Sequence, residues 1–148
     1  VLDAAERAGC RVLVVQGWGD LAGDTPLPAW AHVERDVPHD WLFPRCAAVV
    51  HHGGSGTTGA AARAGVPTII APLGFDQRFW ATRMESLGTS VATIDRRLLT
   101  PATLAPALER AVRDMRVRDA AARLGERLRA ESGTAGAVSR IEAHAARG

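Results

Sequence analysis

The sequence predicts an α/β fold in which helices cover both faces of a parallel β-sheet. Short runs of β-branched residues alternate along the chain with segments whose apolar residues recur at helical spacing. The connections between these runs are short, and strands that alternate with helices in this way form parallel sheets. The length of 148 residues fits one domain, and an apolar content of 47% is enough for a packed core.

The first segment predicts a helix followed by a strand. Residues 1–9 have a helical composition, and Gly9 is a typical helix stop. They show no charged stretch followed by an apolar one, as a signal peptide would. We therefore expect the sequence to begin inside an element, with more of the protein upstream. Residues 11–16 form a largely apolar, β-branched run, which predicts a strand covered on both faces.

The middle of the chain predicts two further strands. Residues 31–34 predict a short strand, and residues 38–43 predict a single helical turn that begins at a proline. Residues 47–51 predict a buried strand, which leads into a glycine-rich turn and then into an alanine-rich helix that ends near Gly65.

The next segment repeats this alternation. Residues 67–71 predict a strand, residues 76–87 a helix that Gly88 ends, and residues 90–94 the last strand. Ligands bind parallel sheets beyond the carboxyl ends of the strands. We expect one crevice there, lined by the loops at residues 17–20, 36–40, 51–57 and 72–77.

The rest of the chain predicts helices to its end. Thr100 is a typical N-cap, Pro101 takes the first helical position, and Gly133 separates the last two helices. Apolar residues at helical spacing are Leu104, Leu108, Val112, Leu124, Leu128, Val138 and Ile141. Arginines and carboxylates alternate along these helices, which indicates ion pairs on a solvated face rather than a nucleic-acid patch. They are Arg110, Arg113, Arg116, Arg118, Arg123, Arg127 and Arg129, with Asp114, Asp119, Glu126 and Glu131.

Charge and cysteine content exclude several classes of protein. All 18 cations are arginine, but a net charge of +2 is too small to indicate a nucleic-acid partner. Cys10 and Cys46 match neither a disulfide framework nor a zinc pattern, so we expect a reducing compartment. No apolar run approaches the roughly 18 residues of a membrane helix. The expected location is cytoplasmic, with peripheral attachment to a membrane left open.

The stretch HHGGSGTTG, residues 51–59, lies between a predicted strand and a predicted helix. Glycines let a backbone approach a phosphate closely, and the free N–H groups at the start of a helix bind anions. Ser55, Thr57 and Thr58 add hydroxyl donors. The stretch is not a Walker A loop, because no Gly-Lys-Ser/Thr follows.

The same stretch contains Gly54-x-Gly56-x-x-Gly59, followed by Asp76, a pattern similar to a dinucleotide fingerprint. Three features argue against that interpretation. Two histidines stand where the strand should run into the first glycine. Asp76 follows its strand by several residues, and two strands precede a motif that should open its domain. A dinucleotide-dependent oxidoreductase domain and a turn without a ligand are kept as alternatives.

Several segments resemble family 1 glycosyltransferases, in the branch of sterol glucosyltransferases and related bacterial antibiotic glycosyltransferases. They are residues 37–43, 50–59, 63–68 and 76–80 and the pair Gly17-Trp18. The resemblance covers essentially the whole chain. It implies a Rossmann-like domain comprising residues 1–148, the carboxy-terminal, donor-binding half of a two-domain GT-B enzyme. The acceptor domain and the first strand of the donor domain would then lie outside this sequence.

The resemblance also implies roles in binding the donor diphosphate. His51 falls on the histidine that reaches the diphosphate, with His52 at the next position, and a neutral or cationic imidazole can donate to phosphate oxygens. The alternative is one core histidine and one satisfied polar group, because adjacent strand residues point to opposite faces. The other implied diphosphate positions are Gly53, Ser55, Gly56 and Thr57.

Asp76 and Gln77 fall on the pair that hydrogen-bonds the donor sugar. A carboxylate accepts from hydroxyls, whereas an amide both donates and accepts. Asp76 is also well placed as a helix N-cap, and the two roles are compatible.

Nucleoside contacts are implied for backbone groups near Val37 and His39. The plant branch of the family stacks a tryptophan on uracil at the position of Asp36, so Trp18 is the candidate here for stacking. For Trp18 and Trp41, a place in the hydrophobic core is an equally good interpretation.

The function implied by the resemblance is inverting transfer of a hexose from a UDP-sugar or dTDP-sugar to a hydroxyl of a lipophilic acceptor, such as a sterol, a lipid or a polyketide-type product. No Asp-x-Asp motif is present, so no metal and no other cofactor is expected. The general base would lie in the acceptor domain, and no catalytic residue is assigned here. We expect this segment alone to be inactive and to self-associate. A non-catalytic nucleotide-sugar-binding subunit, working with a partner chain, is a further alternative.

Overall fold

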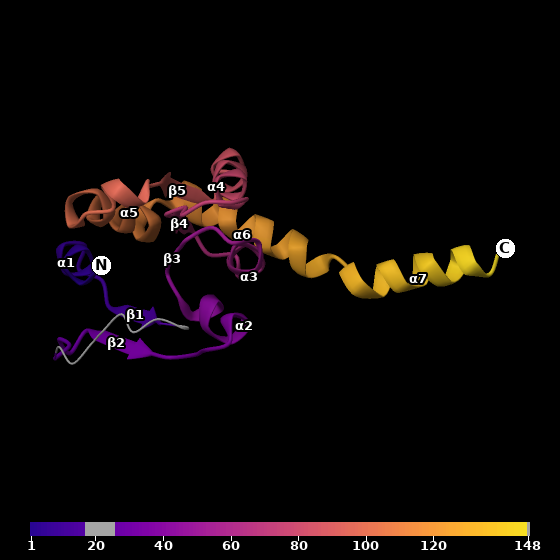
Figure 1. Ribbon diagram of the computed structural model, residues 1–148, viewed down its shortest axis with the longest axis horizontal. Helices are drawn as coiled ribbons and strands as arrows, with labels where there is room; N and C mark the ends of the chain where they lie inside the picture. The colour runs from indigo at the N-terminus through magenta and orange to yellow at the C-terminus, as the bar shows by residue number, and fades with distance from the viewer. Residues whose placement is uncertain (17–25, 148) are drawn as a thin grey trace.

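The computed structural model describes residues 1–16 and 26–147. Within them, five short strands form two parallel sheets, one of two strands in the order β1-β2 and one of three in the order β3-β4-β5. The strands are β1 (Val12–Val15), β2 (Ala31–Glu34), β3 (Val49–His51), β4 (Thr68–Ile70) and β5 (Ser90–Thr93). The predicted parallel α/β fold is confirmed, with the strands divided between two sheets (Figure 1).

Among the described residues, the two sheets have four outer strand edges, and two of these belong to β1 and β3. Among the described residues, no strand pairs with the second edge of β1 or with the edge of β3 that faces away from β4. The prediction that β1 is covered on both faces is wrong: its residues are half-buried throughout, whereas those of the central β4 are buried throughout. Of its described residues only Leu13 and Val15, which share one face, pack against a hydrophobic cluster. In β3, Val49 and His51 are buried but Val50 is 37% exposed.

The predicted helices are present, and each begins or ends within a few residues of the expected position. In the described part of the chain they are α1 (Leu2–Arg7), α2 (His39–Leu42), α3 (Ser55–Ala64), α4 (Gln77–Ser86), α5 (Pro101–Arg113), α6 (Met115–Ala130) and α7 (Gly133–Ala145), with 3-10 turns at Phe43–Arg45 and Arg96–Leu98. Thr100 forms a capping box with Thr103 at the start of α5.

The two isoleucines of β4 show how helices cover both faces of the three-stranded sheet. Successive strand residues point to opposite faces. Ile69 is fully buried in a cluster with Ala4 of α1 and Leu104 of α5. Ile70 is fully buried in a second cluster with Met84 of α4 and, in partial contact, residues of α6. Helices α1 and α5 therefore pack on one face of the sheet, and α3 and α4 pack on the other.

Glycines end the helices as the sequence predicts. Gly9, Gly65 and Gly88 have φ values of +64°, +76° and +69°, in the left-handed region that glycine adopts without strain. Gly65 has a second role, because α6 crosses α3 at this point. A Cβ on Gly125 of α6 would lie 2.7 Å from the Cα of Gly65, so glycine at both positions permits this close backbone contact.

The arginines of the carboxy-terminal helices behave differently from the prediction. In the part of these helices that the structure describes, only Arg110 and Asp114 form an ion pair, at 3.4 Å. Arg118 and Arg129 instead donate to backbone carbonyls of Val112 and Arg63. Carbonyls near helix ends lack intrahelical donors, so these guanidinium groups satisfy them rather than a carboxylate.

α7 stands apart from the body of the molecule (Figure 1). None of its residues is buried, and Val138 and Ile141 are 46% and 69% exposed. Among the described residues, no helix has the length and apolar character that crossing a membrane requires.

Candidate functional site

The turn between β3 and α3 fixes the orientation of His51. The ring lies at the end of β3 and is 9% exposed, and its Nδ1 accepts a hydrogen bond of 3.0 Å from the backbone N–H of Gly53. Since Nδ1 is the acceptor, the ring proton of the neutral imidazole is on Nε2. Nε2 is buried and has no partner among the described residues. Buried donors normally have an acceptor, so this N–H is available to a ligand.

His51 is uncharged at neutral pH. The pKa of His51 is lowered from 6.5 to about 4. Burial is the largest cause, and the charges of His52 and His39 contribute to the same shift. The imidazole can therefore donate a hydrogen bond but does not offer a positive charge.

His52 is exposed. Its ring lies against the backbone of Gly54, where an added Cβ would be 2.5 Å from Nε2 of His52. Gly53 makes the more demanding contact. It has a φ of +91°, and a Cβ there would lie 2.8 Å from Cγ2 of Ile70 and 3.1 Å from the carbonyl oxygen of Gln77. The glycine turn is therefore packed directly against the start of α4.

The amino terminus of α3 provides backbone donors. Gly54 occupies the N-cap position without a side-chain cap, and the N–H of Thr58 is the first to bond within the helix, to the carbonyl of Gly54 at 2.9 Å. The N–H groups of Ser55, Gly56 and Thr57 thus have no intrahelical acceptor. A Cβ on Gly56 would meet nothing within 4 Å. Free amides, open space and a helix amino terminus make this end of α3 suitable for an anion.

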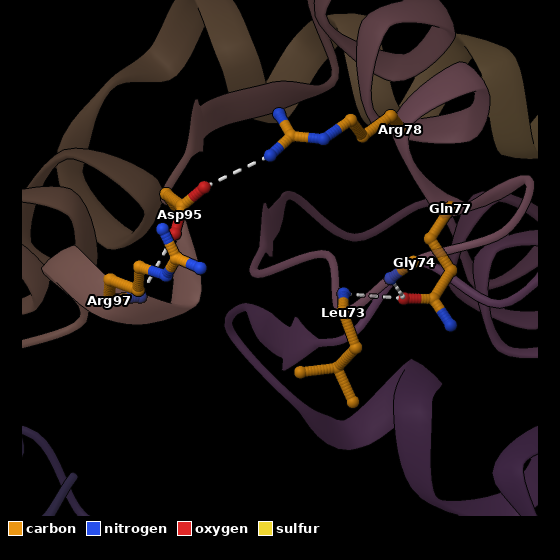
Figure 2. A network of polar contacts seen from close by, with 6 residues as sticks. All are labelled: Leu73, Gly74, Gln77, Arg78, Asp95 and Arg97. Atoms are coloured by element: carbon orange, nitrogen blue, oxygen red, sulfur yellow. Dashed lines mark hydrogen bonds and ion pairs between the residues drawn. The ribbon is translucent and has the colours of Figure 1, made fainter.

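The loop before α4 holds Gln77 in one orientation (Figure 2). Its Oε1 accepts hydrogen bonds from the backbone N–H groups of Leu73, at 2.6 Å, and Gly74, at 3.1 Å. Both partners are donors, so the side-chain atom facing them is the oxygen. The NH₂ group of Gln77 has no partner among the described residues and is free to donate.

Asp76 precedes Gln77 at the N-cap position of α4, but its carboxylate caps no backbone N–H, so the N-cap prediction is wrong for the side chain. The physical reason is its backbone, which has helical values of φ −76° and ψ −4° instead of the extended values from which an N-cap reaches the first turn. Its Oδ2 accepts instead from the indole Nε1 of Trp80 at 2.8 Å.

The implied nucleoside residues are partly placed. His39 begins α2 and stacks on Phe43, with ring centroids 4.4 Å apart. The side chain of Val37 packs in the cluster around Leu42 and Val49. Trp18 lies outside the described residues.

Trp41 is not a core residue, so the core position that the sequence left open for it is excluded. It is 55% exposed, and the guanidinium of Arg45 lies 4.5 Å from its ring centroid.

Two features of the site were missed at the sequence level. One is Trp80, whose spacing of four residues from Asp76 on a helix would place the two side chains on one face. The other is Phe75, the one non-glycine residue with a positive φ in the described chain, at +55°, and with a fully exposed ring. No sequence signal marks that conformation, which is rare for an aromatic residue.

A hollow of about 220 Å³ lies elsewhere, at the amino-terminal ends of β3 and β4, and is lined by residues such as Cys46, Val66 and Met115. None of the buried unpartnered polar atoms of the described chain belongs to its lining; they are on His51, Thr58 and Thr93. The ligand-directed features therefore gather at the carboxyl ends of the strands.

The chain is similar to known glycosyltransferases. Residues 2–143 match the family described as erythromycin biosynthesis protein CIII-like, C-terminal domain. A sterol 3-beta-glucosyltransferase of Candida albicans is 43% identical over 148 residues, covering 95% of this chain and 10% of that protein. A sterol 3-beta-glucosyltransferase of Pichia angusta is 43% identical over 146 residues, covering 95% of this chain and 12% of that protein.

Solved structures of antibiotic glycosyltransferases have the same fold. The calicheamicin glycosyltransferase CalG4 superposes with a TM-score of 0.86 at 26% identity, over 98% of this chain and 39% of that one. The glycosyltransferase VinC, solved in complex with dTDP, gives 0.82 at 29% identity, over 99% of this chain and 38% of that one. The 148 residues thus span about a tenth of the curated relatives and under two fifths of these structures.

The chain belongs to the erythromycin biosynthesis protein CIII-like C-terminal domain family, which is part of the family 1 glycosyltransferases of GT-B fold. This membership favours a glycosyltransferase over the dinucleotide-dependent oxidoreductase that the glycine spacing left open.

Proposed function

We propose that this chain binds the nucleoside-diphosphate sugar of an inverting glycosyltransferase that transfers a hexose to a hydroxyl of a lipophilic acceptor, such as a sterol, a lipid or a polyketide-type product. The observation that carries the proposal is the buried, unpartnered Nε2–H of His51 beside the free amides of α3. Sterol and antibiotic glycosyltransferases among the relatives support the substrate class. The VinC structure with dTDP supports a nucleoside diphosphate as the ligand.

The diphosphate would lie across the amino terminus of α3. The amides of Ser55, Gly56 and Thr57 donate to its oxygens, and the hydroxyls of Ser55 and Thr57 are at hand for the same purpose. His51 adds an N–H from the end of β3. As the glycosidic bond breaks, charge accumulates on the departing diphosphate, and donors fixed in advance stabilise it without reorganisation. Because His51 is neutral, the stabilisation comes from oriented N–H dipoles rather than from a side-chain cation.

The sugar would contact Asp76 and Gln77. Since Oε1 of Gln77 is occupied by two backbone amides, Gln77 acts on a sugar hydroxyl as a donor from its NH₂ group. Asp76 acts as an acceptor. Backbone groups at Val37 and His39, with Trp18 for stacking, remain the proposed contacts of the nucleoside. The donor is a UDP-sugar or a dTDP-sugar, and neither a metal nor another cofactor is part of the proposal.

Transfer of the sugar also requires a site that holds the acceptor. We place the acceptor and the general base in a domain outside these 148 residues, because the relatives are much longer than this chain. Catalysis needs the acceptor hydroxyl held against the sugar and a base within hydrogen-bond reach of it. Residues 1–148 then form the donor domain, and no residue in it is assigned as a base.

Titration with UDP, dTDP and NAD, followed by amide chemical shifts, tests the proposal. UDP or dTDP should shift the amides of residues 53–57 at saturation, and NAD should not. A preference for NAD at these amides would overturn the proposal in favour of a dinucleotide domain. Failure of all three ligands to shift them would overturn the anion site itself. A longer gene product that contains an acceptor domain and transfers sugar would exclude a non-catalytic subunit.

A further inference from the structure

We infer that Trp80 is a positioning residue, which fixes the carboxylate of Asp76 for the donor sugar. The inference rests on the proposed function, because it assigns a task to a residue that acts through the proposed sugar ligand Asp76. The indole Nε1–H donates to Oδ2 of Asp76 at 2.8 Å, from one helical turn further along α4.

Asp76 needs such a partner because little else holds it. The residue is exposed, and its carboxylate makes no cap on α4 and no ion pair in the described part of the chain. An exposed carboxylate without a partner samples several rotamers, and fixing one of them costs entropy when the ligand binds. The hydrogen bond from Trp80 fixes one rotamer of Asp76 before the ligand binds, so less entropy is lost on binding.

Trp80 is suited to the task. Its ring is half-buried, and it meets the ring of Phe79 edge to face, with centroids 5.2 Å apart. An indole N–H can only donate, so it binds the ionised carboxylate and offers a sugar hydroxyl no acceptor in competition. Hydrogen bonds to an ionised acceptor are about twice as strong as neutral ones.

The consequence is a defined pattern of donors and acceptors. The indole engages Oδ2 of Asp76, which leaves Oδ1 for a sugar hydroxyl. The backbone amides of Leu73 and Gly74 engage Oε1 of Gln77, which leaves its NH₂ group. Neighbouring side chains on α4 therefore present one acceptor and one donor. That pattern fits a sugar with two hydroxyls close together, one that donates to Asp76 and one that accepts from Gln77.

The test compares the affinities of UDP-glucose and UDP, measured by calorimetry on the 148-residue chain. Trp80→Phe removes the N–H and keeps an aromatic ring. We expect it to weaken UDP-glucose about five-fold, the scale of one hydrogen bond, and to leave UDP unchanged. The control Arg78→Gln lies on the same helix and removes an ion pair with Asp95 of 3.0 Å (Figure 2). It should change neither affinity.

A double-mutant cycle separates positioning from a general effect on the fold. In an Asp76→Ala background, Trp80→Phe should cause no further loss of UDP-glucose affinity. Three results would overturn the role of Trp80. Trp80→Phe could cause an equal loss of UDP-glucose affinity in the native and Asp76→Ala backgrounds, leave UDP-glucose affinity unchanged in the native background, or weaken UDP in parallel. If Asp76→Ala itself leaves UDP-glucose binding unchanged, the proposed sugar contact fails, and the inference fails with it for that separate reason.

A measurement on the unsubstituted ring covers the case in which Trp80→Phe does not fold. The indole N–H of Trp80 should exchange slowly with solvent in the native chain and quickly in Asp76→Ala. Equal exchange rates in the two chains would show that the hydrogen bond does not hold the ring and carboxylate together, and would overturn the inference.

Discussion

At the scale of single residues, His51 combines two properties that burial produces together. Removal from water keeps the ring neutral, and the hydrogen bond from Gly53 to Nδ1 directs the remaining proton to Nε2. A cation at this position would attract a diphosphate more strongly, but it would be costly to bury. The neutral ring offers a fixed donor instead.

Substitution of His51 tests its contact with the diphosphate. His51→Ala should weaken nucleoside diphosphate binding by about 1–3 kcal/mol, the range for a charge-assisted hydrogen bond. Calorimetry with UDP and dTDP measures the loss. His52→Ala is the matched control, because His52 is the adjacent histidine and is exposed, and it should cost less. Equal losses for the two variants, or no loss for either, would contradict the assignment of His51.

Acid should destabilise the fold through the same ring. The pKa of His51 is about 4 in the folded state and ordinarily 6.5, so between these values the unfolded chain binds more protons than the folded chain. Stability supplied by the neutral ring is complete above pH 6.5 and is lost as the pH falls through about 4. The full loss is about 3 kcal/mol. Urea denaturation of the native chain and of His51→Gln, from pH 7 to pH 4, isolates this contribution from that of the carboxylates.

A His51→Gln variant whose stability falls as steeply with acid as that of the native chain would show that His51 does not titrate in this way.

At the scale of elements, the turn into α3 uses its glycines for two different purposes. Gly53 is required by the fold, because a Cβ would collide with Ile70 and its φ is strongly positive. Gly56 is not required by the fold, because a Cβ added at this position would meet nothing within 4 Å. A glycine that the protein does not need leaves room for a ligand to approach the backbone.

This difference predicts opposite behaviour for two alanine variants. Gly53→Ala should lower the free energy of unfolding by at least about 1–3 kcal/mol, through strain and overpacking. Gly56→Ala should leave it unchanged or raise it by about 0.5–1 kcal/mol, because alanine favours a helix. It should nevertheless weaken UDP or dTDP binding by about 1–2 kcal/mol, because its methyl group occupies the approach to the amides. Thermal denaturation and calorimetry measure both. Native affinity in Gly56→Ala would place the diphosphate elsewhere.

The local part of this architecture could be predicted from the sequence, because a strand, a glycine turn and a helix follow one another within residues 47–65. The stops at Gly65 and Gly88 and the cap at Thr100 are also local. The side-chain partners were not predicted. Asp76 bonds Trp80 rather than the helix backbone, since its dihedral angles are helical. Arg129 of α6 donates to the carbonyl of Arg63, which tertiary packing brings close, and Arg118 donates to the carbonyl of Val112 at the end of α5 rather than to a carboxylate.

The division into two sheets could not be predicted either, because it depends on which strands are neighbours. The alternation of strands and helices indicates parallel pairing but gives no spatial order. β2 and β3 follow one another in sequence, yet they belong to different sheets and do not pair.

At the scale of the whole molecule, the open edges of β1 and β3 predict self-association. Unpaired strand edges recruit further strands, and Val50 adds an exposed apolar side chain to one of them. We expect concentration-dependent dimers or larger species in analytical ultracentrifugation. Val50→Lys should suppress them, because charge on an edge strand opposes pairing. Val138→Lys on the exposed α7 is the control. Suppression by the control alone would move the interface to α7, and a monomer at all concentrations would contradict the prediction.

Transfer of sugar should be absent from these 148 residues alone. The proposed donor site is formed by the turn into α3 and the start of α4, and we propose that the acceptor is held by a domain outside these residues. Orientation of two reactants supplies about 7–11 kcal/mol of a barrier, which a donor site alone cannot provide. We therefore expect donor binding without turnover when the chain is incubated with radiolabelled UDP-glucose and a sterol. A chain that also carries the acceptor domain should transfer the label. Appreciable glycosylation of the sterol by residues 1–148 would show that these residues hold both substrates and a base, and the two-domain proposal would be wrong.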